Sequence, residues 1–532
     1  MNPSRRLFLK SALALSGASA VAATRPRLKG FDIEEATIDD LGRQLASRKI
    51  TAEALTRAYL DRIERLDQSG PRLRSVIETN PEALALAREL DRERQSRGPR
   101  GPLHGIPILI KDNIDTADRM STTAGSLALA NTKPPEDAPL VRRLRAAGAV
   151  ILGKTNLSEW ANFRSSQSTS GWSSRGGLTR NPYSLDRNAS GSSSGSAVAV
   201  AANLAAAAVG TETDGSIVSP SSVNGIVGVK PTVGLVNRRG IIPISRSQDT
   251  AGPMARTVRD AALLLNALAG PDPEDPDSIA RLDGPAPDYA AGLNASGLRG
   301  ARLGIVHNAW GFDRDQVIGN ALEVLRREGA VLVDSLEIAH RGDMSEAEDL
   351  VLHYEFKAGI ADYLARLGST MPHRSLRDLI EFNERHRSTV MPYFGQETFL
   401  AADTKGPLTD PAYLTARANA RRFSREEGID ALMDRHQLDA LVAPTGGPAW
   451  LTDLIHGDRP TGSSSSFAAI SGYPSVTVPG GWVSGLPSGI SFFGRANSEA
   501  ALLRLAYAFE QATRHRKPPR YLPPTGTGLP GR

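Results

Sequence analysis

Short apolar runs alternate with longer stretches of helical periodicity along most of this 532-residue chain, and this alternation limits the possible folds more than any other feature. Apolar runs bounded by turn residues are typical of strands that are buried on both faces. They lie at 106–110, 149–152, 303–306, 331–333, 440–442 and 475–478. Strands that alternate with helices predict an α/β protein with a central sheet. No internal repeat or long linker interrupts the pattern, so we expect one large domain.

Capping residues place the first helices of the chain. Thr37 precedes a helical stretch at 38–47, and Thr51 precedes a second one that extends to about residue 66. The threonine side chain can accept the backbone N–H groups that the first turn of a helix leaves unpaired. Further helices are expected at 81–95 and 140–147.

The chain contains no cysteine, which excludes disulfides, cysteine-based zinc sites, iron–sulfur clusters and a cysteine nucleophile. Serine, lysine and the carboxylates remain as reactive groups. The formal net charge of +5 is small for this length and gives no argument for a nucleic-acid partner.

The N-terminus has the pattern of an export signal. Arg5 and Arg6 precede an uncharged, mostly apolar run at 11–23, and small residues near its end offer cleavage sites. The run is too short to span a bilayer, so we expect no stable membrane anchor. The arginine pair resembles a twin-arginine signal, which directs folded proteins across a membrane. We therefore expect a signal peptide at 1–23, a folded domain at 24–532 and a periplasmic or secreted protein.

Two motif matches are interpreted as accidental. Residues 148–155 satisfy the phosphate-loop pattern, but the apolar residues inside the match predict a buried strand and not a loop with free N–H groups. Residues 191–195 satisfy the G-x-S-x-G pattern with Ser193 at its centre. That nucleophile elbow must follow a strand, whereas the polar residues at 181–190 predict a loop.

A third group of segments is more specific. A Ser/Gly-rich loop at 165–196 leads into a buried small-residue segment at 197–209, expected to be a helix or compact core element. The turn-rich segment 210–220 follows and can present Ser216 beside several backbone N–H groups. A serine nucleophile needs a base, and Lys111 ends an apolar run where burial would lower its pKa.

Five ordered segments resemble the amidase signature family of serine hydrolases, over nearly all of the chain after the signal. They are 105–113 (GIPILIKDN), 153–159 (GKTNLSE), 190–197 (SGSSSGSA), 210–217 (GTETDGSI) and 225–232 (GIVGVKPT). That family uses a lysine, a serine in a cis peptide linkage and a serine nucleophile, and the matching positions assign these roles to Lys111, Ser192 and Ser216. The resemblance also implies one α/β domain around a large mixed sheet, with neither a metal ion nor an organic cofactor.

The variant wording of the motifs is most similar to bacterial peptide amidases, which release ammonia from C-terminal peptide amides. Asp214 and Val218 stand where glycine and arginine are frequent in the family. These departures leave the three triad positions intact. The resemblance implies that backbone N–H groups of Thr213, Asp214, Gly215 and Ser216 stabilise the oxyanion.

Alternatives to a peptide amidase remain at this point. The substrate could be a small aliphatic or aryl amide. The chain could be the glutaminase component of a transfer-RNA amidotransferase, which an export signal argues against, or an inactive periplasmic binding protein, which the retained triad argues against. The oligomeric state is left open. His104, Lys154 and the basic tail at 514–520 are interpreted as structural or solvated residues.

Overall fold

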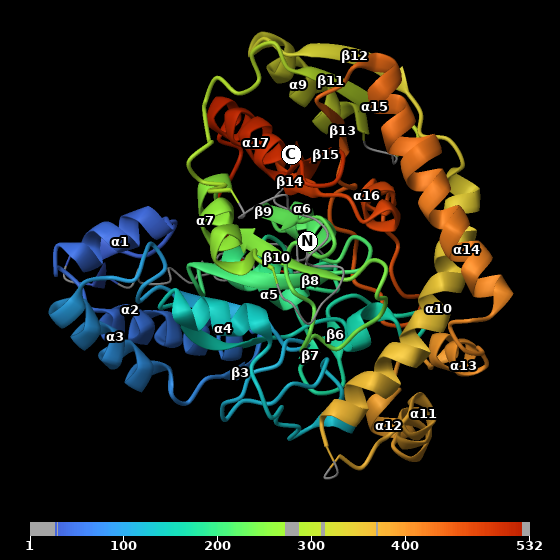
Figure 1. Ribbon diagram of the computed structural model, residues 1–532. Coiled ribbons are helices and arrows are strands. Elements are labelled where there is room, and N and C mark those ends of the chain that lie inside the picture. The colour runs from blue at the N-terminus through green and yellow to red at the C-terminus, as the bar shows by residue number, and fades with distance from the viewer. Residues whose placement is uncertain (1–26, 29, 272–286, 310–313, 369–370, 524–532) are drawn as a thin grey trace, which may run out of the picture.

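The computed structural model describes residues 27–28, 30–271, 287–309, 314–368 and 371–523, with one large mixed sheet at its centre (Figure 1). The expected signal peptide at 1–23 lies outside the described residues. The strand order is β12-β11-β13-β15-β14-β9-β10-β8-β4-β5-β3. The bounds are β3 (Val76–Thr79), β4 (Pro107–Lys111), β5 (Val150–Thr155), β8 (Ala207–Glu212), β9 (Val227–Lys230), β10 (Thr250–Ala255), β11 (Arg302–Val306), β12 (Val331–Leu336), β13 (Ala440–Pro444), β14 (Ser475–Val483) and β15 (Leu486–Phe493). All six apolar runs of the sequence form strands, and the predicted α/β fold is confirmed.

The sheet contains two groups of strands that a hairpin joins. Strands β12, β11 and β13 are parallel to one another, as are β5, β4 and β8 in the other group. The antiparallel hairpin β14–β15 pairs with β13 on one side and with β9 on the other. In the described residues, no other strand connects the two groups.

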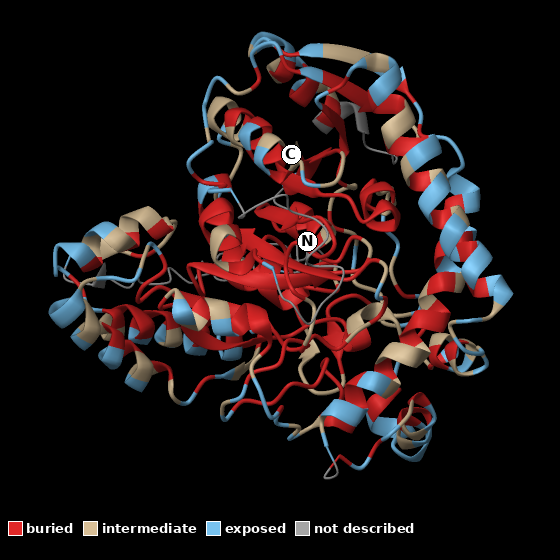
Figure 2. Ribbon diagram, viewed as in Figure 1, coloured by how far each residue is buried: buried red, intermediate tan, exposed pale blue. Residues whose placement is uncertain are grey.

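Helices cover both faces of the sheet, and the buried residues concentrate along its strands (Figure 2). The helices named below are α1 (Ile38–Ala46), α2 (Ala52–Arg62), α3 (Ala83–Arg97), α4 (Pro139–Ala146), α5 (Ser194–Ala201), α6 (Val218–Val223), α7 (Val258–Leu268), α10 (Arg341–Arg366), α14 (Pro411–Arg421), α16 (Ser465–Ser471) and α17 (Glu499–Thr513). The shorter or more peripheral ones are α9 (Arg314–Arg327), α11 (Leu376–Arg385), α12 (Arg387–Val390), α13 (Glu397–Asp403) and α15 (Asp430–His436). Helices α10 and α14 pack together along one side of the molecule (Figure 1).

The predicted helix starts are confirmed. Thr37 caps α1 in a capping box with Asp40, and Thr51 caps α2 by accepting the N–H of Ala54. Helix α2 continues as a π-helical segment, Ile63–Gln68, close to the end expected for it. None of the helices in the described ranges combines the length and apolar character needed to cross a membrane.

Three sequence interpretations need correction. The segment 197–209 is not one element: α5 ends at Ala201 and β8 begins at Ala207. Residues Gly210 to Glu212, expected in a turn, complete β8, because their pairing with β10 continues to Thr250. The basic tail is not simply solvated, since Arg516 contacts Glu35 (2.8 Å) and the hydroxyl of Tyr183 (2.7 Å).

Candidate active site

Lys111 is the last residue of β4, and its side chain is completely buried. Its Nζ donates hydrogen bonds to Ser192 Oγ (2.7 Å), to Thr211 Oγ1 (2.8 Å) and to the Thr211 carbonyl (3.1 Å). Thr211 lies on β8, the parallel neighbour of β4. The sheet therefore brings together a lysine and a serine that are 81 residues apart in the chain.

The surroundings of Lys111 disfavour its ammonium form. Burial lowers its pKa to about 7, although the nearby carboxyl groups of Asp249 and Glu212 act in the opposite direction. Near neutral pH a large fraction of Lys111 is thus an uncharged amine that can accept a proton.

Ser192 lies in a tightly packed turn before α5. The Gly191–Ser192 peptide bond is cis, and the Ser192 carbonyl accepts the N–H of Ser158 (3.1 Å). A Cβ at Gly191 would lie 2.2 Å from the Ser158 hydroxyl, so this close approach requires glycine.

Ser193, the centre of the G-x-S-x-G match, uses its hydroxyl to hold the backbone. Its Oγ donates to the Thr211 carbonyl (3.0 Å) and accepts the Thr211 N–H (3.2 Å). The side chain is fully buried, and no strand precedes it at 181–190. Its geometry is that of a structural serine and does not fit a nucleophile elbow.

The loop 213–216 connects β8 to α6 and is anchored at both ends. Glu212 accepts the backbone N–H groups of Ile217 (2.7 Å) and Val218 (3.0 Å), which begin the helix. The Asp214 carboxylate accepts the hydroxyls of Ser465 and Ser466 at the start of α16. The loop is therefore fixed by side chains from outside it.

Ser216 is the member of the predicted triad that retains exposed surface. It is 7% exposed, whereas Lys111 and Ser192 are at 0%. Its carbonyl accepts the N–H of Ser193 (3.1 Å), which places the loop against the Ser192 turn. Within the described ranges, the Ser216 hydroxyl has no hydrogen-bond partner, and the N–H groups of Asp214, Gly215 and Ser216 donate to no protein acceptor. These groups are available to a substrate.

Sequence reasoning missed several residues of this site. Thr211 holds Lys111, Asn113 donates to Thr211 Oγ1 (3.0 Å), and Asp249 accepts the Thr213 hydroxyl (2.6 Å). Thr211 could have been found as a polar residue in an otherwise apolar strand. The positions of Asp249 and of Ser465 depend on contacts between distant segments, and no local pattern indicates them.

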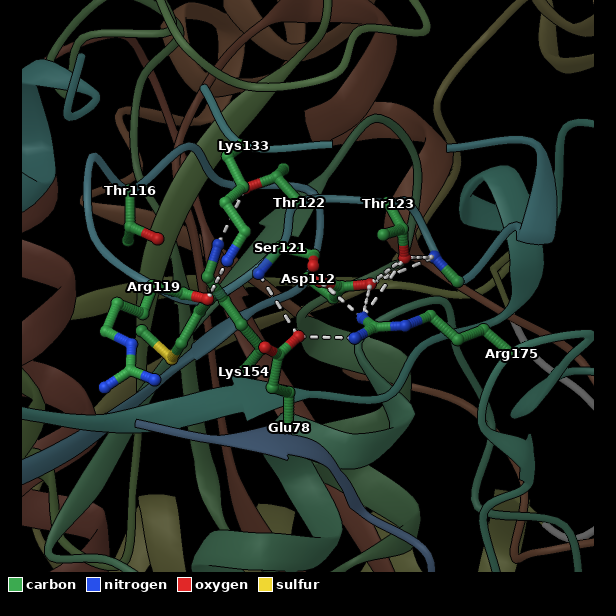
Figure 3. Close-up of polar contacts among 12 residues, drawn as sticks. Glu78, Asp112, Thr116, Arg119, Ser121, Thr122, Thr123, Lys133, Lys154 and Arg175 are labelled. Atoms are coloured by element: carbon green, nitrogen blue, oxygen red, sulfur yellow. Dashed lines mark hydrogen bonds and ion pairs between the residues drawn. The ribbon is translucent and has the colours of Figure 1, made fainter. Parts of the chain in front are cut away.

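Two residues interpreted as structural are buried away from Ser192 and Ser216. His104 contacts the Leu90 carbonyl through Nε2 (2.9 Å). Lys154, which belongs to the phosphate-loop match, lies in β5 and donates to the Ile114 carbonyl and to Thr122 Oγ1 (2.8 Å). Beside it, Arg175 bridges the carboxylates of Glu78 and Asp112 (Figure 3). No cluster of three or more metal-ligating side chains occurs in the described part of the chain.

The fold and this arrangement of serines and lysine define an amide-hydrolysing enzyme. The profile of the amidase family matches residues 54–503, and the chain belongs to that family. The chain is similar to the native peptide amidase of Stenotrophomonas maltophilia, with 54% identity, a TM-score of 0.87, and coverage of 91% of this chain and 98% of that one.

Curated relatives carry amidase names as well. The "Probable amidase" of Arabidopsis thaliana is 44% identical over 526 residues, 97% of each chain. A component of the glutamyl-tRNA(Gln) amidotransferase of Pseudomonas syringae pv. syringae is 34% identical over 493 residues, which is 90% of this chain and 98% of that protein. The family resemblance predicted from the five segments is therefore confirmed.

Proposed function

We propose that this enzyme hydrolyses C-terminal amides of peptides through a Ser216–Ser192–Lys111 triad. The observation that carries the proposal is the 2.7 Å contact between Ser192 and a lysine whose burial lowers its pKa to about 7. A buried, largely neutral amine beside a serine is the base that a serine nucleophile requires when no histidine is present.

The proposed reaction begins with attack of Ser216 Oγ on the amide carbonyl carbon. The Ser216 proton passes to Ser192 Oγ, and the Ser192 proton passes to the lone pair of Lys111 Nζ. Collapse of the tetrahedral intermediate breaks the C–N bond, and the same relay returns the proton to the departing ammonia. Water then attacks the acyl ester, gives its proton to the relay and releases the peptide acid with the Ser216 hydroxyl restored.

The loop 213–216 would bind the oxyanion of that intermediate. The N–H groups of Asp214, Gly215 and Ser216 donate to no described protein group, and Gly215 has φ +75°, a conformation that favours glycine. The loss of one oxyanion donor typically lowers kcat by about 10²–10³.

Similarity to a peptide amidase over most of the chain supports the peptide substrate. The likeness to an amidotransferase component supports a second candidate, a glutaminase activity. Ammonia release from an amidated peptide, free glutamine and small aliphatic or aryl amides, measured side by side, separates these substrates. A preference for glutamine or for small amides over the amidated peptide would refute the peptide assignment.

The nucleophile is tested by comparing two serines. Ser216→Ala should abolish turnover and labelling by a fluorophosphonate probe. Ser193→Ala, which removes a backbone contact, should keep much of the activity. Labelling that persists in Ser216→Ala and disappears in Ser193→Ala would overturn the triad and support Ser193 as the nucleophile.

We also propose that the enzyme is exported through its arginine pair. Replacing Arg5 and Arg6 by lysine should leave folded, active precursor in the cytoplasm, because the chain has no cysteine and needs no disulfide. Fractionation of cells that express both forms tests this, and normal delivery of the double variant to the periplasm would refute it.

A further inference from the structure

Helix α10 buries two carboxyl groups on one face, Glu348 and Glu355, two turns apart. Both face the segment 245–248, which precedes β10. Glu355 accepts hydrogen bonds from the N–H (2.8 Å) and hydroxyl (2.6 Å) of Ser247 and from the hydroxyl of Ser245. Glu348 accepts the side-chain amide of Gln248 (2.7 Å). The helix therefore holds this segment at two points.

Gln248 connects this segment to the loop 213–216. The same Nε2 that donates to Glu348 donates its other hydrogen to the Thr213 carbonyl (3.3 Å). The next residue, Asp249, accepts the Thr213 hydroxyl (2.6 Å) and is itself held by the N–H groups of Ile244 and Ser245. Backbone and side chain of Thr213 are thus both held from one segment.

The contact to the Thr213 carbonyl has a geometric consequence for Asp214. The carbonyl of one residue and the N–H of the next share a planar peptide group, and in a trans peptide they point in opposite directions. Fixing the Thr213 carbonyl toward Gln248 therefore fixes the direction of the Asp214 N–H. That N–H is one of the donors without a protein acceptor in the described residues.

We propose that Gln248, oriented by Glu348, is a positioning residue that aims the Asp214 N–H at the oxyanion. Glu348 acts through Gln248 and touches no reacting atom. The inference rests on the function proposed above, because it assumes that Ser216 is the nucleophile of this loop.

The chemistry of Glu348 is consistent with this role. Burial raises its pKa well above the usual value, and the neighbouring Asp214 carboxyl raises it further. A carboxyl oxygen accepts a hydrogen bond in the neutral acid as in the carboxylate, so the contact to Gln248 is kept in either form. A glutamine at this position would also offer an acceptor oxygen of the same shape.

The test compares Glu348→Met with Glu346→Met, an exposed position on the same helix. Ammonia release gives kcat and KM, expressed per active site titrated with a fluorophosphonate. Glu348→Met should lower kcat by about 10- to 100-fold with KM within about threefold, because misplaced donors weaken mainly the transition state. Inhibition by a peptide aldehyde, which forms an oxyanion-like adduct with serine, should weaken by the same factor. Glu348→Gln should lie within about fivefold of the parent, and Glu346→Met should match it.

A second variant covers the case in which Glu348→Met folds poorly. Gln248→Met should reproduce the loss of kcat, and adding Glu348→Met to it should cost no more than about twofold, because the two residues act as one unit. Additive losses, a change in KM alone, or an unchanged kcat per titrated site would overturn the positioning role. Retained activity of Ser216→Ala would refute the proposed function itself, whereas an inactive Ser216→Ala with a fully active Glu348→Met would refute only this inference.

Discussion

Two lysines on neighbouring parallel strands show how the same residue can serve opposite purposes. Lys111 ends β4 and Lys154 lies in β5, one register position away, and both side chains are completely buried. Each Nζ donates to a hydroxyl and to a backbone carbonyl. Burial lowers the pKa of both. Neither burial nor a hydroxyl partner therefore distinguishes a base from a structural cation.

The difference lies in the carboxylates and in access to solvent. Lys154 is surrounded by Asp112, Asp115, Asp118 and Glu78, which favour its ammonium form, and its hydroxyl partner Thr122 is fully buried (Figure 3). Only Asp249 and Glu212 act in this way on Lys111. The hydroxyl partner of Lys111 lies in the turn that contacts the loop of the partly exposed Ser216. A buried lysine can act as a base where it has few carboxylates around it and a route to a reachable nucleophile.

The largest effect is expected from removing the proposed base. Lys111→Ala should lower kcat/KM by about 10²–10⁴, and Lys111→Arg should fail about as badly, because arginine keeps the charge but does not deprotonate. The parent enzyme should lose kcat/KM as the pH falls through about 7, where Lys111 becomes charged. Near-parent turnover of Lys111→Arg would mean that the site needs a positive charge and not a proton acceptor.

Lys154→Met should affect stability instead. Removal of the cation leaves buried carboxylates such as Asp112 with less compensating charge, and breaking a buried charge pairing costs about 3–5 kcal/mol. Denaturant unfolding should show this loss, while kcat per titrated active site stays close to that of the parent. Lys133→Met, at an exposed lysine, serves as the control. A pH profile that changes as in the Lys111 variants would remove the distinction between the two lysines.

The smallest effect is expected from Thr211→Val. Thr211 Oγ1 accepts a hydrogen bond from Lys111, and this bond favours the ammonium form more than the neutral amine. Its loss should lower the pKa of Lys111 further and move the acid limb of kcat/KM to lower pH by about 0.5 to 1 unit. A shift to higher pH would contradict the charge environment described for Lys111.

The sequence predicted those features that local chemistry determines. The apolar runs became strands, and Thr37 and Thr51 became helix caps, because burial and capping depend on residues close together in the chain. The five family segments indicated Lys111, Ser192 and Ser216, and the structure places Lys111 against Ser192. Their roles in catalysis remain predictions.

The residues that sequence reasoning missed depend on contacts across the fold. Gln248 and Glu348 meet over 100 positions, and Arg516 reaches Glu35 over 481. The split of 197–209 into helix and strand was missed for another reason. A run of alanine and valine is buried throughout, so its hydrophobic pattern contains no period that would mark the boundary.

The β14–β15 hairpin has a consequence for how the chain is made. It is the last pair of strands in the order of synthesis, yet it lies between the two groups of strands that it joins. A ribosome-bound chain that ends before residue 475 can pair β8 with β4 and β11 with β13, but the two halves of its sheet share no strand pairing. Completion of the native sheet is therefore a post-translational event, and any chaperone that holds the growing enzyme must protect two open sheet edges, those of β9 and β13, until the hairpin closes both.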